Sequence, residues 1–233
     1  MLTTALALFL AHLLADYPLQ NSWIIKNKKQ SLAMACHIAV VFLLTFLALR
    51  GNLLPALTIT SAHLIIDLIK THYAPDKLWA YLTDQAAHVA TIALVLIAWP
   101  ELGTLWPEAT ATTNYILVLT SGLILSVWAG GPAIGYLMEK FEDARGDSLP
   151  EAGRTIGMLE RALVFLMIIS GQPGSIGFLI AAKSIFRFDT TADNRKVAEY
   201  VIIGTLASFG WALLVSYGAL SLITITGITP ATP

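Results

Sequence analysis

The chain places histidine and aspartate residues at a spacing that could assemble a metal site. Three histidine–aspartate pairs are separated by four residues, and a fourth histidine lies in an apolar segment of its own; together these residues are His12, Asp16, His37, His63, Asp67, Asp84 and His88. Residues four apart share one face of an α-helix, so each pair would direct two polar groups the same way. Imidazole and carboxylate groups that converge from several helices are typical of transition-metal sites.

The residue types also suggest how the work of such a site would be divided. The expected metal ligands are His12, His37, His63, Asp67 and His88. Asp84 and Asp16 are expected to act as further ligands or as the catalytic base. Zinc in a catalytic site needs three protein ligands and a water, so this set could hold one or two ions, with Mn, Fe or Co as alternatives. A metal can lower the pKa of bound water to about 7, which predicts metal-assisted hydrolysis.

Two other interpretations of the same residues stay open. Histidine–aspartate hydrogen bonds could form a structural network or a proton relay, because such chains also line pumps and transporters. The residues could also make separate contacts between helices, with no shared site. Gln20 and Gln85 could orient ligands from outside the metal shell, although each could equally be an ordinary polar residue.

The composition predicts a multi-pass helical membrane protein. Of 233 residues, 56% are hydrophobic and 12% are charged, whereas a soluble domain is about 25% charged. The mean hydropathy is +0.71. A net charge of −1 gives no indication of nucleic-acid binding. The lone cysteine, Cys36, excludes an intrachain disulfide.

The apolar segments predict an all-α bundle of seven or eight helices. The expected helices cover residues 2–16, 31–49, 53–71, 79–99, 114–138, 155–171, 174–188 and 197–224. The first lacks the basic residues and cleavage site of a signal peptide, so we expect it to be retained. The 155–188 region is broken by Gly171-Gln172-Pro173-Gly174, which favours a helical hairpin, with one broken helix as the alternative.

The clearest internal boundary is an extracytoplasmic loop at 100–113, which is rich in Pro, Gly and Thr and has no Lys or Arg. It separates a four-helix bundle at 1–99, which holds every histidine, from a C-terminal membrane region at 114–233 with basic motifs.

The distribution of Lys and Arg predicts the orientation. Basic residues gather in the loops at 17–30, 72–78, 139–154 and 189–196, and cytoplasmic loops are enriched in such residues. This predicts an N-terminus outside the cytoplasm, with every basic loop inside it, provided that residues 155–188 enter and leave the membrane on the same side. Each expected donor then lies within roughly 5–14 Å of the cytoplasmic surface, at about 1.5 Å of rise per residue.

The C-terminal region offers a candidate for the charged end of a substrate. Its basic residues Arg154, Arg161, Lys183 and Arg187 could form a cytoplasmic pocket for a phosphate or a lipid head group. In the alternative, they anchor the protein in the membrane and pair with Glu160 and Glu199.

Several motifs resemble those of the DUF3307 family of bacterial membrane proteins. They are HLLADYPLQ at 12–20, HLIID at 63–67, DQAAH at 84–88, GRTIGMLER at 153–161 and EYVIIGTL at 199–206. The resemblance implies a shared fold, and the family has no assigned activity. The first half is more loosely similar to inner-membrane proteins described as metal-dependent hydrolases.

The sequence as a whole favours a metal-dependent hydrolase at the cytoplasmic leaflet, acting on a membrane-associated substrate such as a phosphorylated lipid. Membrane lipid is the expected partner, and nucleic acid is not. The alternatives are a transporter for a metal ion or proton, and a structural or regulatory membrane subunit in which the metal joins the helices.

Overall fold

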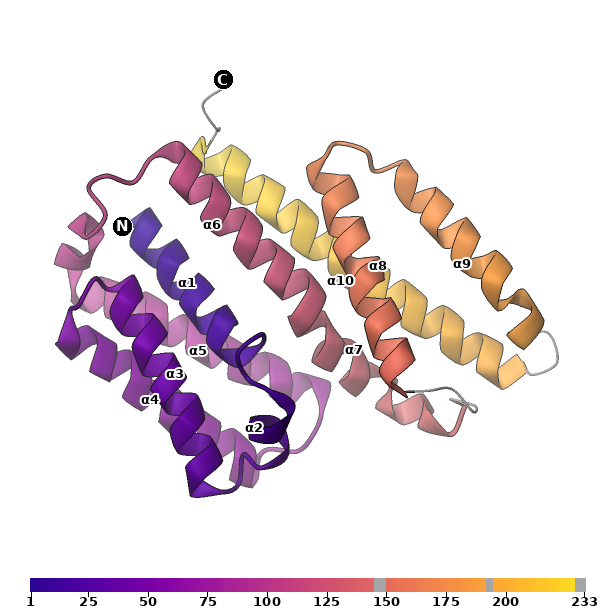
Figure 1. Ribbon diagram of the computed structural model, residues 1–233, viewed down its shortest axis with the longest axis horizontal. Coiled ribbons are helices and arrows are strands. Elements are labelled where there is room, and N and C mark those ends of the chain that lie inside the picture. The colour runs from indigo at the N-terminus through magenta and orange to yellow at the C-terminus, as the bar shows by residue number, and fades with distance from the viewer. Residues whose placement is uncertain (145–149, 192–194, 229–233) are drawn as a thin grey trace. The chain divides into compact units, whose positions relative to one another are not determined.

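The protein is an all-helical, multi-pass membrane protein, which confirms the predicted fold class. The computed structural model describes residues 1–144, 150–191 and 195–228, and it has no β-strand within these ranges (Figure 1). Among the described residues, five helical segments are long and apolar enough to cross a membrane: Ser31–Ala48, Leu53–Tyr73, Leu78–Ala98, Ala111–Asp143 and Arg195–Thr226.

The first four predicted helices are present with their ends within two residues of the expected positions: α1 (Leu2–Asp16), α3 (Ser31–Ala48), α4 (Leu53–Tyr73) and α5 (Leu78–Ala98). A short helix, α2 (Ser22–Lys26), lies in the predicted 17–30 loop. It begins where the Asn21 side chain accepts a hydrogen bond from the Ile24 amide at 3.0 Å, as an N-cap does. The 100–113 loop contains a 3₁₀ turn, η1 (Pro100–Thr104).

The predicted 114–138 helix is interrupted by a π-helical turn. It consists of α6 (Ala111–Ile124), the π-helical segment η2 (Leu125–Ala129) and α7 (Gly130–Met138), followed by a 3₁₀ segment, η3 (Glu139–Ala144).

A helical hairpin follows, as predicted, and not a single broken helix. Helices α8 (Pro150–Ile169) and α9 (Ser175–Thr191) run side by side in opposite directions (Figure 1). Gly171, at φ +71°, ends α8 in a left-handed turn that suits glycine. The Gln172 amide donates to the Met167 carbonyl oxygen at 2.8 Å, which satisfies the helix end. The last helix is α10 (Arg195–Thr226).

The chain divides into two compact units. The first unit contains residues 1–124 and the end of α10 from residue 223, and the second contains residues 125–222. In the first unit α1 packs against α3, α5 and α6, so α6 belongs with the histidine-bearing helices. The core of this unit includes Leu8, Ala56, Ile59 and Ile92. The second unit has its own core, which includes Val164, Ile168, Ile176, Phe209 and Ala212.

A buried arginine stabilises the π-helical turn. Arg161, only 3% exposed, donates from Nε to the Ser126 carbonyl oxygen at 2.9 Å and from Nη2 to that of Val127 at 2.7 Å. Its Nη1 donates to Ser208 Oγ at 3.2 Å. A π-helical turn changes the α-helical bonding pattern, and buried carbonyl groups need partners. Arg161 supplies them from α8.

The close packing around Arg161 predicts a destabilising substitution at the start of α7. A Cβ atom on Gly130 would lie 2.7 Å from Trp211 Cδ1 and 2.8 Å from Arg161 Nε. We expect Gly130→Ala to lower the free energy of unfolding by about 1–3 kcal/mol, because overpacking displaces both side chains. Gly135→Ala in the same helix is the control, because no atom lies within 4 Å of its new Cβ.

Thermal unfolding of the detergent-solubilised variants measures the difference. Gly135→Ala should match or exceed the wild type, since alanine is the better helix former by about 1 kcal/mol. Equal stability of the two variants would contradict the packing described for Arg161.

Candidate metal centre

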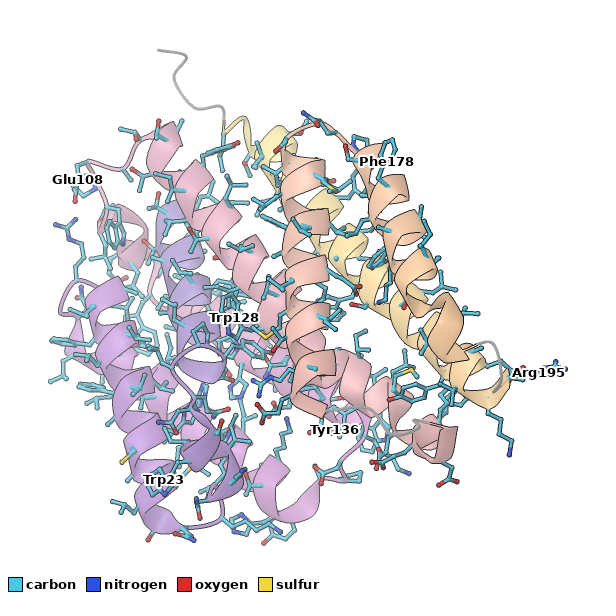
Figure 2. The ribbon with its side chains drawn as sticks, turned by 45° about the vertical axis from the view of Figure 1, so that its right-hand side comes forward. Trp23, Glu108, Trp128, Tyr136, Phe178 and Arg195 are labelled. Carbon is cyan, nitrogen blue, oxygen red and sulfur yellow. The ribbon has the colours of Figure 1, made fainter. Side chains whose placement is uncertain are left out.

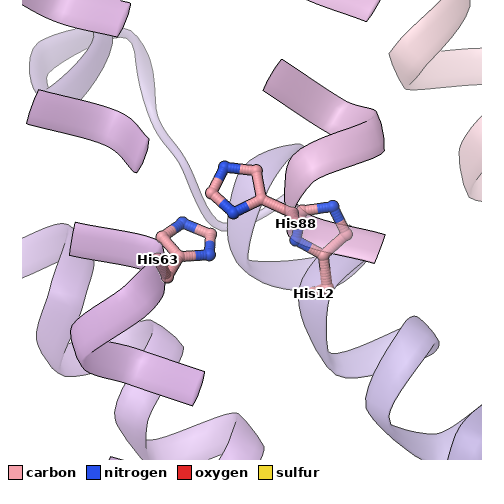
Figure 3. A group of neighbouring side chains, drawn as sticks. All are labelled: His12, His63 and His88. Carbon is pink, nitrogen blue, oxygen red and sulfur yellow. The ribbon is translucent and has the colours of Figure 1, made fainter. Parts of the chain in front are cut away.

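Four helices of the first unit each direct one histidine into a common buried cluster. His12 comes from α1, His37 from α3, His63 from α4 and His88 from α5, and each is at most 6% exposed. Figure 3 shows His12, His63 and His88 converging from three helices. The carboxylates join them, so the structure brings together all seven residues singled out in the sequence: His12, Asp16, His37, His63, Asp67, Asp84 and His88.

The tightest part of the cluster joins two imidazoles and two carboxylates. His37 Nε2 lies 3.2 Å from Asp67 Oδ2 and 3.5 Å from Asp16 Oδ1. His63 Nε2 lies 3.3 Å from the same Asp16 atom and 3.6 Å from the same Asp67 atom. The two Nε2 atoms are themselves 3.2 Å apart. Two nitrogens and two oxygens that face each other at this spacing could be drawn onto one metal ion.

Two further groups of potential ligands overlap with this one. His88 Nε2 lies 3.6 Å from Asp84 Oδ1 and 4.0 Å from Asp67 Oδ1. The His88 ring also stacks on that of His63, with centroids 4.0 Å apart, and lies 5.1 Å from that of His12. Because the groups share His63, His88 and Asp67, one ion or two neighbouring ions could be held.

Several polar atoms of the cluster are buried without a hydrogen bond of good geometry, although the Asp16 and Asp67 oxygens among them lie close to imidazole nitrogens. Among the described residues they are His12 Nδ1, Asp16 Oδ1, Asp67 Oδ2, Asp84 Oδ1 and His88 Nε2. Leaving one such atom unsatisfied costs about 1–3 kcal/mol, and more if it is charged. These are nitrogen and oxygen donors of the kind that bind transition metals, so the residues fit a metal ion.

The cluster is layered along the helices. Leu8, Val41, Ile59 and Ile92 are each four residues from a histidine on the same helix, on the side away from the carboxylates. With Thr45, Thr91 and three of the imidazoles, they line a small cavity. The site is thus apolar on one side and ionic on the other. We call the ionic side, where the 17–30 and 74–77 loops lie, the basic end of the first unit.

Two lysines of the basic end complete the site, and sequence reasoning missed them. Lys28 Nζ lies 2.8 Å from Asp67 Oδ1, and Lys70 Nζ lies 3.1 Å from Asp84 Oδ2. In the sequence, the basic 17–30 loop that contains Lys28 served only to predict the orientation. Lys70 follows Asp67 by three residues, a spacing that places it on the helix face of the cluster but does not indicate its partner, Asp84. Lys28 is 39 residues from Asp67, and nothing in the sequence pairs them.

Gln85 and Tyr17 link the histidine and carboxylate layers. Gln85 Nε2 donates to Asp84 Oδ2 at 3.0 Å, and its Oε1 lies 3.3 Å from His12 Nε2. Tyr17 donates its hydroxyl to Gln85 Oε1 at 2.9 Å, so Tyr81, at 2.5 Å, donates to Tyr17. Burial is the main reason why the pKa of Tyr17 is raised, and the neighbouring Tyr81 raises it further. The Tyr17 hydroxyl therefore stays protonated and can donate this hydrogen bond.

Gln20 has a similar place on the other side of the cluster. When the Gln20 side-chain amide is oriented so that both its nitrogen and its oxygen form hydrogen bonds, the nitrogen donates to the Asp16 backbone carbonyl oxygen at 3.2 Å. The oxygen then accepts from Lys28 Nζ at 3.3 Å. Both glutamines considered as orienting residues therefore contact the cluster.

The basic residues of the second unit have separate surroundings. Lys183 Nζ pairs with Glu160 Oε2 at 2.7 Å, and Arg195 Nε pairs with Glu199 Oε1 at 2.9 Å. Arg161 is occupied by backbone carbonyl groups, so it has a structural role in place of the expected substrate-binding one. Arg154 is exposed, and the side chain of Arg187 lies outside the described part. The pair of Lys183 with Glu160 agrees with the alternative interpretation, whereas Glu199 pairs with Arg195, which is not among the four basic residues considered.

The fold and the site together define a multi-pass helical membrane protein with a buried histidine–aspartate cluster. Residues 4–117 match DUF3307, described as a protein of unknown function, and this part of the chain belongs to that family. The match includes all seven residues of the cluster, whereas the motifs at 153–161 and 199–206 lie beyond it. No curated protein and no solved structure matches the chain.

Proposed function

We propose that the protein is a membrane-embedded, metal-dependent hydrolase that acts at the cytoplasmic leaflet on a membrane-associated substrate, such as a phosphorylated lipid. One observation carries the proposal: five buried nitrogen and oxygen atoms lack hydrogen-bond partners and converge within one cluster. The proposed cofactor is one or two divalent transition-metal ions, with Zn first and Mn or Fe as alternatives.

The residues divide the proposed chemistry between them. His37, His63, Asp16 and Asp67 have the closest donor atoms and would hold an ion. A bound divalent ion would supply Lewis acidity and lower the pKa of a water molecule. Asp84 Oδ1, which has no hydrogen-bond partner and faces His88, would accept the proton of the attacking water.

The lining of the cavity favours hydrolysis over transport. Beyond the imidazoles the cavity walls are Leu, Val, Ile and Thr side chains, so no ionisable group in this lining continues a path away from the basic end. Transporter sites more often lie near the midplane, at the junction of related repeats. The cluster has its polar approach on one side, as an active site at a membrane surface would.

We also propose that the protein lies in the bacterial inner membrane with its N-terminus outside. The basic end of the first unit carries Lys26, Lys28 and Lys29, and Trp23 is exposed on the neighbouring α2. Glu108 lies at the opposite end of this unit (Figure 2), where it pairs with Arg50. Lysine is enriched in cytoplasmic loops, and tryptophan marks membrane interfaces. The basic end would then face the cytoplasm.

The proposal predicts that the variant Asp84→Asn binds metal but has lost most of its hydrolytic activity. After incubation with Zn²⁺ or Mn²⁺ and gel filtration in detergent, the wild type should retain one or two metal equivalents by elemental mass spectrometry. It should also hydrolyse phosphate esters or phospholipids. Asp84→Asn should retain metal and lose about 10²–10⁴-fold in rate, the usual contribution of a general base. A wild type that binds no metal would overturn the proposal.

A further inference from the structure

We propose that Lys28 and Lys70 form an anion site that binds the phosphate group of the substrate once the metal is in place. The inference rests on the proposed function and specifies its substrate class: a compound that presents a tetrahedral phosphate oxyanion to the basic end of the first unit. It also places this recognition next to the metal ligands and not among the basic residues of the second unit.

The two lysines stand between the buried carboxylates and the surroundings. The side chains of Lys28 and Lys70 are 22% and 26% exposed, while their partners Asp67 and Asp84 are 1% and 6% exposed. Lys70 is also held over the Tyr81 ring, with Nζ 5.2 Å from its centroid. A ligand that approaches the cluster from the basic end would meet both ammonium groups before it reaches the imidazoles.

The charges of the cluster change sign when metal binds. With neutral histidines, three carboxylates and two ammonium groups leave a single net negative charge. One divalent ion makes the net charge positive by one, and two ions make it positive by three. A buried net charge is costly unless it is paired. The metal-bound site, with its net positive charge, should therefore bind an anion, whereas the metal-free site, with its net negative charge, should not.

Metal binding would also release the lysines to bind that anion. Asp67 and Asp84 each offer an oxygen within 4.8 Å of the other and of a His88 nitrogen. Once Asp67 Oδ2 binds the metal ion and Asp84 Oδ1 accepts the proton of the water, less negative charge is left on the opposite oxygens, which pair with Lys28 and Lys70. Both ammonium groups then become available to an anion. Lysine is a common phosphate ligand, and a phosphate has oxygens for both ammonium groups and the metal.

The basic residues of the second unit are less suited to this task. Arg161 is bound to carbonyl oxygens, and Lys183 already pairs with Glu160, which is 6% exposed and takes no part in the cluster. No bound metal would free either residue.

The test measures phosphate binding and metal content on the same detergent-purified samples. Inorganic phosphate is titrated into zinc-loaded and metal-free wild type, Lys28→Gln and Lys70→Gln, with calorimetric detection. Lys29→Gln and Lys77→Gln are matched controls, since both lysines are exposed. Lys29 lies in the same loop as Lys28, and Lys77 lies in the loop that follows the helix of Lys70. Thermal unfolding confirms that each variant is folded. A second arm uses nanodiscs in which a lipid with a phosphate monoester head group replaces a zwitterionic lipid.

We expect zinc to strengthen phosphate binding at least tenfold. Lys28→Gln and Lys70→Gln should each weaken it at least tenfold while they retain the metal, and the controls should match the wild type. Tighter binding to the monoester nanodiscs than to free phosphate would show that the phosphate group belongs to a lipid. Tighter binding to free phosphate would show that the ligand is a soluble phosphate compound.

Three results would overturn the inference, and they separate it from the proposed function. Equal phosphate affinity with and without zinc would show that metal binding does not make the lysines available to phosphate. Unchanged affinity in both lysine variants would place the anion elsewhere. A wild type that holds zinc but binds neither free phosphate nor the monoester lipid would defeat this inference alone, whereas one that holds no metal would defeat both.

Discussion

Replacing His63 by alanine should reduce bound metal to less than a tenth of the wild-type content. His63 contributes to two of the three potential ligand groups, and its Nε2 atom is within 3.6 Å of Asp16, Asp67 and His37. Its removal would leave no complete group except Asp67, Asp84 and His88. That group offers one imidazole and two carboxylates that are paired with Lys28 and Lys70, so it should bind metal weakly in the presence of a competing chelator.

His72→Ala provides the matched control for this variant. His72 lies on the same helix, α4, but is exposed, and its Nδ1 atom is 3.0 Å from the Leu68 carbonyl oxygen. Elemental mass spectrometry after dialysis against a weak chelator should find wild-type metal content in His72→Ala. Equal metal content in the two variants would show that the metal binds outside the cluster.

Removing the metal should lower the thermal stability of the wild type by about 5–10 °C. A ligand present at a hundred times its dissociation constant stabilises the folded state by about 2.7 kcal/mol. For a chain of this size, 1 kcal/mol corresponds to about 2–4 °C. The physical source of the effect is the set of five buried atoms without hydrogen-bond partners, which a bound ion would satisfy.

The unfolding temperature with and without EDTA, followed by intrinsic fluorescence in detergent, measures this effect. His63→Ala should show no EDTA-dependent shift, because it has no metal to lose. The shift in the wild type should shrink as the pH falls, because protons compete with the metal for the imidazole nitrogens and carboxylate oxygens. An EDTA shift of the same size in His63→Ala would count against the site.

The sequence predicted the convergence of the cluster because helical periodicity carries the necessary information. His63 and Asp67, four residues apart in an apolar segment, must share a helix face. The alternation of helices across the membrane then brings His12, His37, His63 and His88 to one depth. The helix ends were predicted well for the same reason, since long apolar segments have clear limits.

Contacts that depend on loops and local irregularities could not be predicted in this way. Lys28 reaches Asp67 from a loop whose path is set by the capped α2, and no periodicity describes such a path. The π-helical turn at Leu125–Ala129 has an apolar sequence that also suits an α-helix. Arg161, which bonds to this turn, was predicted to bind substrate because it is charged. The sequence of its own helix gives no indication of the carbonyl groups that face it.

The layered cluster also constrains the biosynthesis of the protein. Its four histidines come from four different helices, and the last of these, α5, starts only at Leu78. During synthesis His12, His37 and Asp67 reach the membrane before His88 and Asp84 exist, so part of the cluster is unsatisfied in lipid, where polar groups are costly. Helices inserted in the wrong orientation would leave Asp67 without Lys28 and without His37. The residues proposed for catalysis therefore also favour correctly inserted chains over misinserted ones.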